Sequence, residues 1–163
     1  MEGKLIIFSA PSGSGKTTIV RELLKHYTQF EFSISATSRA PRGVEQNGVD
    51  YYFLTQEEFA AKVADDAFVE WEEVYAGTCY GTLKSEVERI WAKGNTILFD
   101  VDVKGGCSLK RYYGERALFI FVQAPSVEVL RERLVGRGDT SLEEIEKRVS
   151  KAEYEMTFAK FAD

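Results

Sequence analysis

Three nearly continuous apolar segments occur along the chain, at residues 4–9, 96–102 and 117–122. Such runs are typical of parallel strands that are buried beneath helices on both faces of a sheet. Elsewhere apolar residues recur at helical spacing. Helices are predicted at residues 19–26, 55–66, 82–93, 103–113, 127–134 and 142–161. This alternation predicts a doubly wound α/β fold with a parallel sheet.

The stretch between residues 32 and 80 interrupts that alternation. Its short segments mix polar and apolar positions, which favours half-solvated strands at residues 31–35, 51–54 and 68–75. Residues 36–50 form a polar loop with a proline and an Asn-Gly turn. Residues 76–81 are predicted to be a turn, and Thr82 is expected to cap the next helix. We interpret the stretch as an inserted mixed β/α region, well placed to hold a second ligand.

Composition limits the classes of protein to consider. With 163 residues, of which 44% are hydrophobic, the chain should form one domain with a proper core. No apolar run approaches the roughly 20 residues of a membrane-spanning helix, and the residues before the first strand do not form a secretory signal. Cys79 and Cys107 lack zinc-type spacing, so we expect a cytoplasmic protein. The net charge of −5 argues against a dedicated nucleic-acid binder but allows a nucleotide ligand.

A phosphate-binding loop is predicted at residues 10–18, which read Ala-Pro-Ser-Gly-Ser-Gly-Lys-Thr-Thr between the first strand and the first helix. A strand, a small-residue loop ending in Gly-Lys-Thr, and a helix in this order define a P-loop. Its backbone N–H groups and the positive end of the helix would hold an anion. Lys16 would reach the β- and γ-phosphates, and the Thr17 hydroxyl would bind Mg²⁺. Ala10 replaces the usual first glycine, which costs little if its backbone dihedral is ordinary.

Two arginines in the inserted region suggest a second anion site. Arg39 and Arg42 lie on a turn that is rigidified by Pro41, and they suit bidentate capture of a phosphate. Tyr51 and Tyr80 could add phenolic donors. The alternatives are solubilising loop charges for the arginines and simple packing for the tyrosines.

Glu70 follows an apolar pair and is a candidate for reading a base. A carboxylate can accept two hydrogen bonds from adjacent N–H groups, which guanine presents on its Watson–Crick edge and adenine does not. Alternatively, Glu70 shares an acidic solvent face with Glu72, because alternate residues of a strand point to the same side.

Charged side chains also gather toward the end of the chain and after the second apolar run. Arg133, Arg137 and Arg148 lie near the break between the last two helices, where a mobile lid could bring them over transferring phosphates. The alternatives are a helix-surface charge for Arg133 and an i,i+4 pair with Glu144 for Arg148. Asp100 and Asp102 end a buried strand, where carboxylates are costly unless they are paired or bind metal.

Together these segments resemble the guanylate kinase family over essentially the whole chain. The resemblance rests on residues 9–17, 32–42, 47–51, 68–71, 80–82, 98–105 and 133–138. It implies a P-loop NTPase-type fold and transfer of the ATP γ-phosphate to GMP, with Mg²⁺ as cofactor. It also implies ATP and GMP as small-molecule partners, no nucleic acid or membrane partner, and a monomer or dimer.

The resemblance also implies roles for individual residues, carried over position by position. Stabilisation of the transferring phosphoryl group falls to Lys16, Arg42, Arg137 and Arg148. ATP binding falls to Ala10, Pro11, Ser12, Gly13, Ser14, Gly15, Lys16, Thr17, Thr18, Arg133 and Arg137. GMP binding falls to Ser35, Arg39, Arg42, Tyr51, Glu70, Tyr80, Thr82, Asp100 and Asp102. Thr17 would bind Mg²⁺ together with water and phosphate oxygens, and Asp100 would approach the ion through water.

By the same resemblance, the chain is expected to form a single domain with three parts. The core would comprise residues 1–32, 83–124 and 145–163, the GMP-binding region residues 33–82, and the lid residues 125–144. Two departures are apparent: the loop between Tyr75 and Cys79 is one residue longer than the common version, and the family's C-terminal strand and helix are missing. We expect a truncated form rather than a natural short one.

Three rival interpretations keep the P-loop or the fold but change the function. One is a kinase for another nucleoside monophosphate, against which Glu70 argues because it suits the paired N–H donors of guanine. Residues 102–105 fit the D-x-x-G element of a regulatory GTPase, but the sequence contains no Asn-Lys-x-Asp guanine-reading motif. A guanylate kinase-like interaction module would keep the fold and bind protein ligands. Such modules tend to have lost P-loop or lid residues, which are present here.

Overall fold

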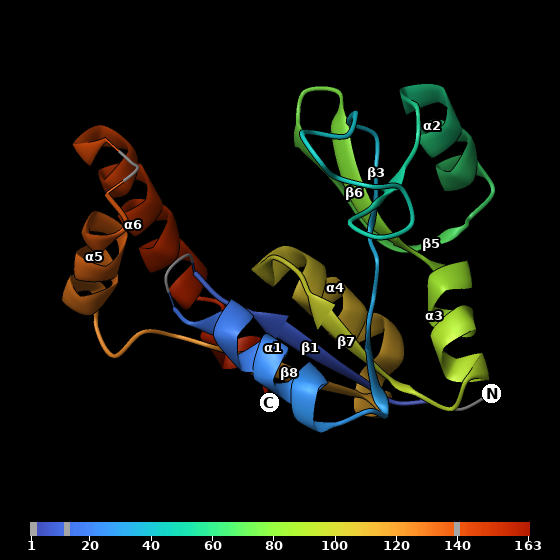
Figure 1. Ribbon diagram of the computed structural model, residues 1–163, viewed down its shortest axis with the longest axis horizontal. Coiled ribbons are helices and arrows are strands. Elements are labelled where there is room, and N and C mark those ends of the chain that lie inside the picture. Colours follow the sequence, from blue (N-terminus) through green and yellow to red (C-terminus); the bar gives the residue numbers. More distant parts are fainter. Residues whose placement is uncertain (1–2, 12–13, 139–140) are drawn as a thin grey trace.

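A four-stranded parallel sheet forms the centre of the molecule (Figure 1). The computed structural model describes residues 3–11, 14–138 and 141–163. The sheet has the order β2-β7-β1-β8, and all of its pairings are parallel. Its strands are β1 (Leu5–Ser9), β2 (Phe30–Phe32), β7 (Thr96–Asp100) and β8 (Ala117–Phe121). The three apolar runs of the sequence are thus the three adjacent strands β7, β1 and β8.

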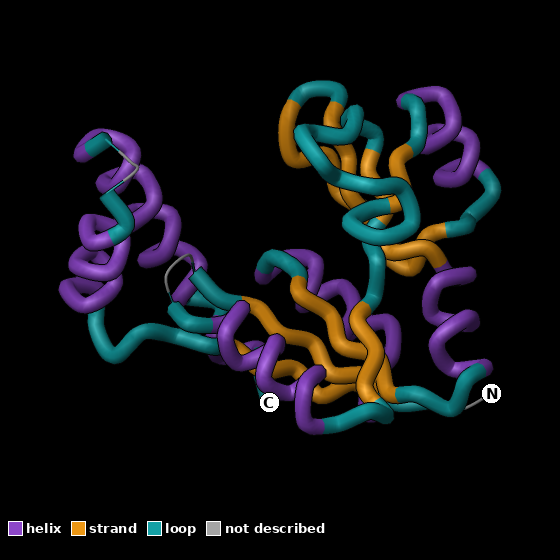
Figure 2. The backbone as a smooth tube through the Cα atoms, viewed as in Figure 1, coloured by secondary structure: helices purple, strands orange, loops and turns teal. Residues whose placement is uncertain are grey.

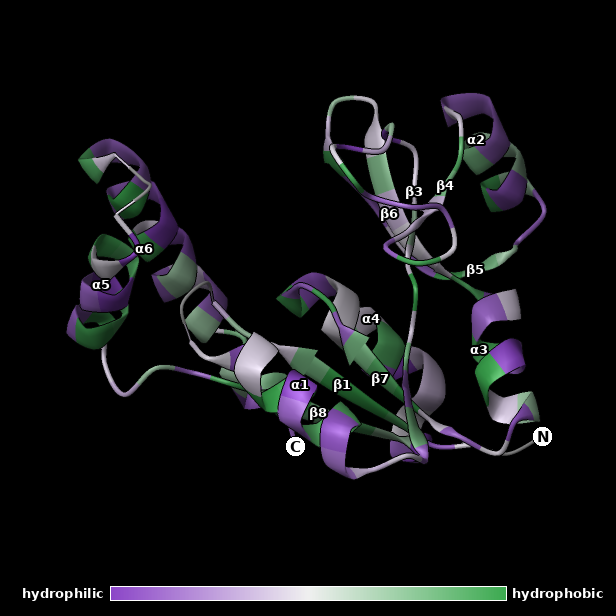
Figure 3. Ribbon diagram, in the orientation of Figure 1, coloured by the Kyte–Doolittle hydropathy of each residue, from purple (hydrophilic) through white to green (hydrophobic). Residues whose placement is uncertain are grey.

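Helices cover both faces of this sheet, because its strands are apolar on both sides (Figure 3). On one face, Ile7 and Phe99 pack with residues of α3 (Lys84–Ala92) and α4 (Val103–Tyr113). On the other face, Phe8 and Leu98 pack with Val20 of α1 (Lys16–His26). The predicted doubly wound α/β architecture is confirmed.

A smaller mixed sheet lies beyond one end of the core (Figure 2). It has the order β4-β3-β6-β5, in which β3 pairs parallel with β4 and antiparallel with β6. Its strands are β3 (Ala36–Thr37), β4 (Tyr52–Phe53), β5 (Phe68–Tyr75) and β6 (Thr78–Leu83). The helix α2 (Gln56–Ala64) packs on it through Phe59, which stacks on Phe68 with ring centroids 4.5 Å apart.

Two further helices project from the opposite end of the core (Figure 1). They are α5 (Val127–Gly136) and α6 (Leu142–Met156). They have a small hydrophobic cluster of their own, in which Leu130 and Leu134 meet Ile145 and Val149. Short 3-10 turns lie at η1 (Gly114–Arg116) and η2 (Ala159–Phe161).

Several predicted boundaries were wrong, each for a tertiary reason. The strand expected at 31–35 forms only in part: β2 ends at Phe32 and β3 begins at Ala36, and between them the backbone N–H of Ile34 donates to the Glu86 carboxylate instead of to a strand. The turn expected at 76–81 is shorter, since pairing with β5 begins at Thr78. Thr82 lies within β6 and does not cap α3, whose N-cap is Leu83.

The ends of two other elements also differ from the prediction. The strand β7 ends at Asp100, and Asp102 caps α4 by accepting a hydrogen bond from the backbone N–H of Gly105 at 2.7 Å. The last long helix ends at Met156 instead of continuing to residue 161. The capping box predicted at Thr55 and Glu58 is confirmed in both directions.

The packing of α4 on the sheet leads to a first prediction. A Cβ atom at Gly106 would lie 2.8 Å from the ring of Phe119, which is buried, so any side chain there forces the helix away from the strand. Gly106→Val is expected to lower the free energy of unfolding by roughly 1–3 kcal/mol, with about 2–4 °C in Tm for each kcal/mol. Thermal unfolding followed by circular dichroism measures this change.

A glycine on another helix provides the control. Gly136, the last residue of α5, has no atom within 4 Å of an added Cβ. Gly136→Ala should therefore leave Tm unchanged or raise it slightly. Equal Tm values for Gly106→Val and the wild type would contradict the tight packing of α4.

Candidate active site

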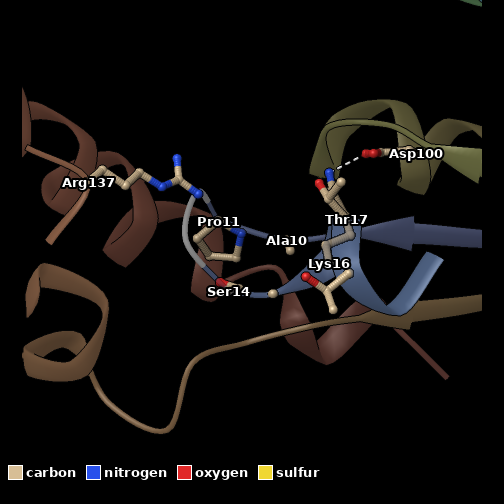
Figure 4. Close-up of a pocket in the computed structure, with 9 residues that line it drawn as sticks. Ala10, Pro11, Ser14, Lys16, Thr17, Asp100 and Arg137 are labelled. Carbon is tan, nitrogen blue, oxygen red and sulfur yellow. Dashed lines mark ion pairs between the residues drawn. The ribbon is translucent and has the colours of Figure 1, made fainter. Parts of the chain in front are cut away.

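The P-loop forms a pocket at the carboxyl end of β1. It has a volume of about 290 Å³ and is lined by Ala10, Pro11, Ser14, Gly15, Lys16, Thr17, Thr18, Asp100 and Arg137 (Figure 4). Gly15 precedes α1 with φ of 93°, a left-handed conformation that glycine adopts without strain. Asp66 is the only non-glycine residue with positive φ in the described ranges, so Ala10 has an ordinary backbone, as expected. Ser12 and Gly13 lie outside the described residues.

Two features of this pocket suit an anion. The N-terminus of α1 opens into it, where unpaired N–H groups and the helix dipole favour negative charge. The Ser14 hydroxyl is buried and has no hydrogen-bond partner among the residues that the structure describes. A phosphate would supply the missing acceptor.

Lys16 forms an ion pair with Asp100, across from Arg137 on the other side of the loop (Figure 4). The register places Phe8 of β1 beside Asp100 of β7, so the P-loop and this carboxylate meet at the same edge of the sheet. In the parallel sheet, this is the edge where ligands bind.

A second pocket, of about 230 Å³, adjoins the first. It takes in six residues of the set expected to bind GMP: Ser35, Tyr51, Glu70, Tyr80, Asp100 and Asp102. Glu72 and Lys151 also line it. Asp100 borders both pockets, so the two hollows meet at the carboxylate that pairs with the P-loop lysine.

Glu70 lies on β5 with its carboxylate directed into the second pocket. One oxygen accepts a hydrogen bond of 2.9 Å from the hydroxyl of Thr82, which is fully buried. The pKa of Glu70 is raised to about 7, mainly by burial and also by the nearby charges of Asp102 and Glu72, while the hydrogen bond from Thr82 opposes the rise. Thr82 does not line the pocket itself, and it is connected to the pocket through this hydrogen bond to Glu70.

Arg39 does not line this pocket itself, but two of its three neighbours, Tyr51 and Tyr80, do. Its guanidinium forms a bidentate ion pair with Glu45 at 2.7 and 2.9 Å and donates to the Tyr80 hydroxyl at 3.1 Å. It also lies 5.0 Å from the ring centroid of Tyr51. The hydrogen bonds from Arg39 and from the backbone N–H of Arg42 lower the pKa of Glu45 to about 2, so the pair stays charged.

The other candidate arginines, Arg42, Arg133 and Arg148, line neither of the two pockets. The side chain of Arg42 is exposed. Arg133 lines a shallow hollow beside the P-loop together with Arg137. Nη2 of Arg148 lies 3.8 Å from Oε1 of Glu144. This is the i,i+4 ion pair that the sequence offered as the simpler role for Arg148. The structure thus brings Arg137 to the P-loop and leaves Arg42 and Arg148 outside both pockets.

Sequence reasoning missed three residues of this site. Glu45, which holds Arg39, gave no signal beyond its nearness in the loop. Glu72 was noted only as a possible surface neighbour of Glu70, yet it lines the same pocket. Lys151 follows Arg148 by three residues on α6, so helical periodicity could have indicated it.

The parallel sheet and the P-loop, with a second pocket beside it, define a protein of the P-loop nucleotide-binding class. The family model described as "Guanylate kinase" matches residues 2–162. The chain belongs to the guanylate kinase family.

Individual relatives agree with this assignment. A guanylate kinase of Bacteroides thetaiotaomicron is 61% identical over 159 residues, which are 98% of this chain and 78% of that one. A guanylate kinase of Porphyromonas gingivalis is 56% identical over 161 residues, 98% of this chain and 86% of that one. The crystal structure of guanylate kinase from Anaplasma phagocytophilum superposes with a TM-score of 0.73 at 28% identity, covering 99% of this chain and 74% of that chain.

Among the residues that the structure describes, no helix has both the length and the apolar character needed to cross a membrane.

Proposed function

We propose that the P-loop pocket binds ATP and that the second pocket binds GMP. The chain is an ATP:GMP phosphotransferase, as its family is. The observation that supports this division is Asp100, which lines both pockets and pairs with Lys16. Two substrates bound on either side of this residue would have their phosphates next to each other, as direct transfer requires.

On the donor side, the loop backbone and the start of α1 would hold the β- and γ-phosphates. Lys16 would leave Asp100 and bind the γ-phosphate instead. Its ammonium group would then stabilise the negative charge on the phosphoryl group during transfer. Arg137, the residue that follows α5, lines the same pocket and would neutralise the phosphoryl group from the opposite side. Arg133 lies next to it along the proposed ATP site.

On the acceptor side, Arg39, Tyr51 and Tyr80 form a connected group that would hold the GMP phosphate. Glu70 and Thr82, with Ser35, would read guanine. Two N–H donors of the base match the two oxygens of the Glu70 carboxylate, which the structure leaves facing the pocket.

The donor atoms present fit Mg²⁺, which prefers oxygen ligands. The hydroxyl of Thr17 and the carboxylate of Asp100 both line the P-loop pocket. Thr17 would hold the ion together with phosphate oxygens and water, and Asp100 would contact it through water. When bound, the ion neutralises charge on the β- and γ-phosphates.

Phosphoryl transfer then needs little covalent chemistry from the protein. An oxygen of the GMP phosphate attacks the γ-phosphorus in line, the bond to the β-phosphate oxygen breaks, and ADP and GDP leave. The chain's own task is to align the two phosphates, supply positive charge and exclude water.

We further propose that residues 125–144 act as a lid, with residues 33–82 as the acceptor region. The lid helix α5 packs on α6 in a hydrophobic cluster that is separate from the central core, so the two helices can move together. Closure would bring Arg148, on the helix α6 that packs against the lid, and, from the other side, Arg42 toward the transferring group. A cytoplasmic location and small-molecule partners only, with no nucleic acid or membrane, are proposed from the charge and composition of the chain.

A coupled assay of ADP release tests the assignment of substrates. With ATP and Mg²⁺, GMP is expected to support turnover at least about 100-fold better than AMP, UMP or CMP, because only guanine offers paired N–H donors to Glu70. Release of ADP without any acceptor would indicate an ATPase instead. Binding of GMP without turnover would indicate an interaction module.

A further inference from the structure

Glu86 is a fully charged side chain in the interior, only 1% exposed, in the first turn of α3. An uncompensated carboxylate there would be strongly destabilising. Although burial raises the pKa of Glu86, hydrogen bonds from Arg89, Tyr52 and the backbone of Ile34 together lower it below its usual range. The group therefore remains ionised, and its hydrogen bonds are charge-assisted.

The donors to Glu86 come from three separate parts of the chain. The backbone N–H of Ile34 donates at 3.0 Å and the Tyr52 hydroxyl at 2.6 Å. Arg89 donates from Nε at 3.1 Å and from Nη2 at 2.7 Å. One buried carboxylate thus joins α3 to the segment before β3 and to β4.

Two of these donors stand next to residues of the acceptor pocket. Ile34 precedes Ser35, and Tyr52 follows Tyr51; Ser35 and Tyr51 both line that pocket, whereas Glu86 does not. The two segments are also bonded to each other, since the backbone N–H of Tyr52 donates to the carbonyl of Ser35 at 2.9 Å. A shift of the Glu86 carboxylate would therefore move both pocket residues.

The same network reaches back to the core. Arg89 donates to Glu31 of β2 at 2.7 Å, and Glu31 also accepts a hydrogen bond from Asn95 at 3.0 Å. Figure 1 shows that the segment before β3 and the helix α3 both connect the core to the smaller sheet. Glu86 therefore fixes the acceptor region against the core where these connections lie.

We infer that Glu86, with Tyr52 and Arg89, is a positioning residue for the acceptor nucleotide: it sets the placement of Ser35 and Tyr51 without touching the substrate. This inference rests on the proposed function of the second pocket. A network that served only stability would lower Tm and leave the affinity for GMP unchanged.

Tyr52→Phe is the decisive variant, because it removes one hydroxyl and keeps the ring. It is expected to raise the Kd for GMP and the KM for GMP about 5–10-fold, the value of one buried hydrogen bond, with kcat and the KM for ATP within about twofold. Glu86→Gln should have a larger effect, about 10–100-fold, because it removes the charge that holds Arg89. Titration calorimetry with GMP alone and steady-state kinetics measure these constants.

Lys93→Ala is the matched control. Lys93 contacts only the far end of the network, with Nζ 3.2 Å from Glu31, and its side chain is largely exposed. The Lys93→Ala enzyme should have the same Kd for GMP and the same KM values as the wild type. If the wild type binds no GMP, the proposed function and the inference both fail. If the wild type binds GMP and Tyr52→Phe binds it equally well, the inference alone is overturned, whatever the change in Tm.

Discussion

Lys16→Ala is expected to reduce kcat for phosphoryl transfer by about 10³-fold or more, with the KM for GMP within a few-fold of the wild type. A cation that follows the γ-phosphate during transfer stabilises the transition state more than the bound substrates, so its loss appears mainly in kcat. Lys16 is the cation between the two proposed sites, since its partner Asp100 lines both pockets. Coupled ADP release with saturating ATP·Mg²⁺ and GMP measures the change.

Another lysine of the same helix serves as the control. Lys25 lies in the last turn of α1, where it contacts the exposed Glu22 at 3.3 Å. Lys25→Ala should retain wild-type kinetics. A Lys16→Ala enzyme that folds, as judged by circular dichroism, and keeps kcat within tenfold of the wild type would exclude the proposed catalytic role.

Glu70→Gln should raise the KM for GMP about 100-fold and change the KM for ATP less than twofold. The amide offers guanine one acceptor and turns a donor toward the second N–H of the base, so one charge-assisted hydrogen bond is lost and a repulsive contact is added. Glu73→Gln, on the same strand but exposed, is the matched control. An equal loss for both nucleotides would contradict a guanine-reading role.

The pKa of Glu70, raised to about 7, adds a dependence on pH. Guanine binds the carboxylate, so protonation below pH 7 should weaken GMP, with the KM rising about tenfold between pH 8 and pH 6. The GMP phosphate also titrates near pH 6. In Glu70→Gln only that phosphate contribution should persist, so an identical pH profile in both enzymes would argue against the raised pKa.

The raised pKa of Glu70 also makes the stability of the fold depend on pH in a defined direction. The pKa of Glu70 is higher in the folded chain than in the unfolded one, so this group favours the folded state most below about pH 4.5 and loses that contribution as pH rises through 7. Without ligand, Glu70→Gln should therefore raise Tm at pH 8 relative to the wild type and not at pH 5. The acceptor pocket retains a carboxylate that is unfavourable for stability but suited to binding.

Much of the fold follows from local sequence. The continuous apolar runs can only be buried on both faces, which requires a parallel sheet under helices, as β1, β7 and β8 show. The capping box at Thr55 fixed the start of α2 through two local hydrogen bonds. The P-loop was predictable because strand, loop and helix are consecutive, although its pocket is completed by Asp100 and Arg137 from distant parts of the chain.

The sequence by itself therefore determined the parallel core, the P-loop with Lys16, and the family pattern of the site. The tertiary structure alone decided that Asp100 lies between two pockets, that Glu45 holds Arg39, and that Glu86 ties the acceptor segments to α3. The physical reason is separation along the chain. Caps and loops form between residues a few positions apart, whereas Glu86 meets Ile34 across 52 positions, a pairing that only the packed fold specifies.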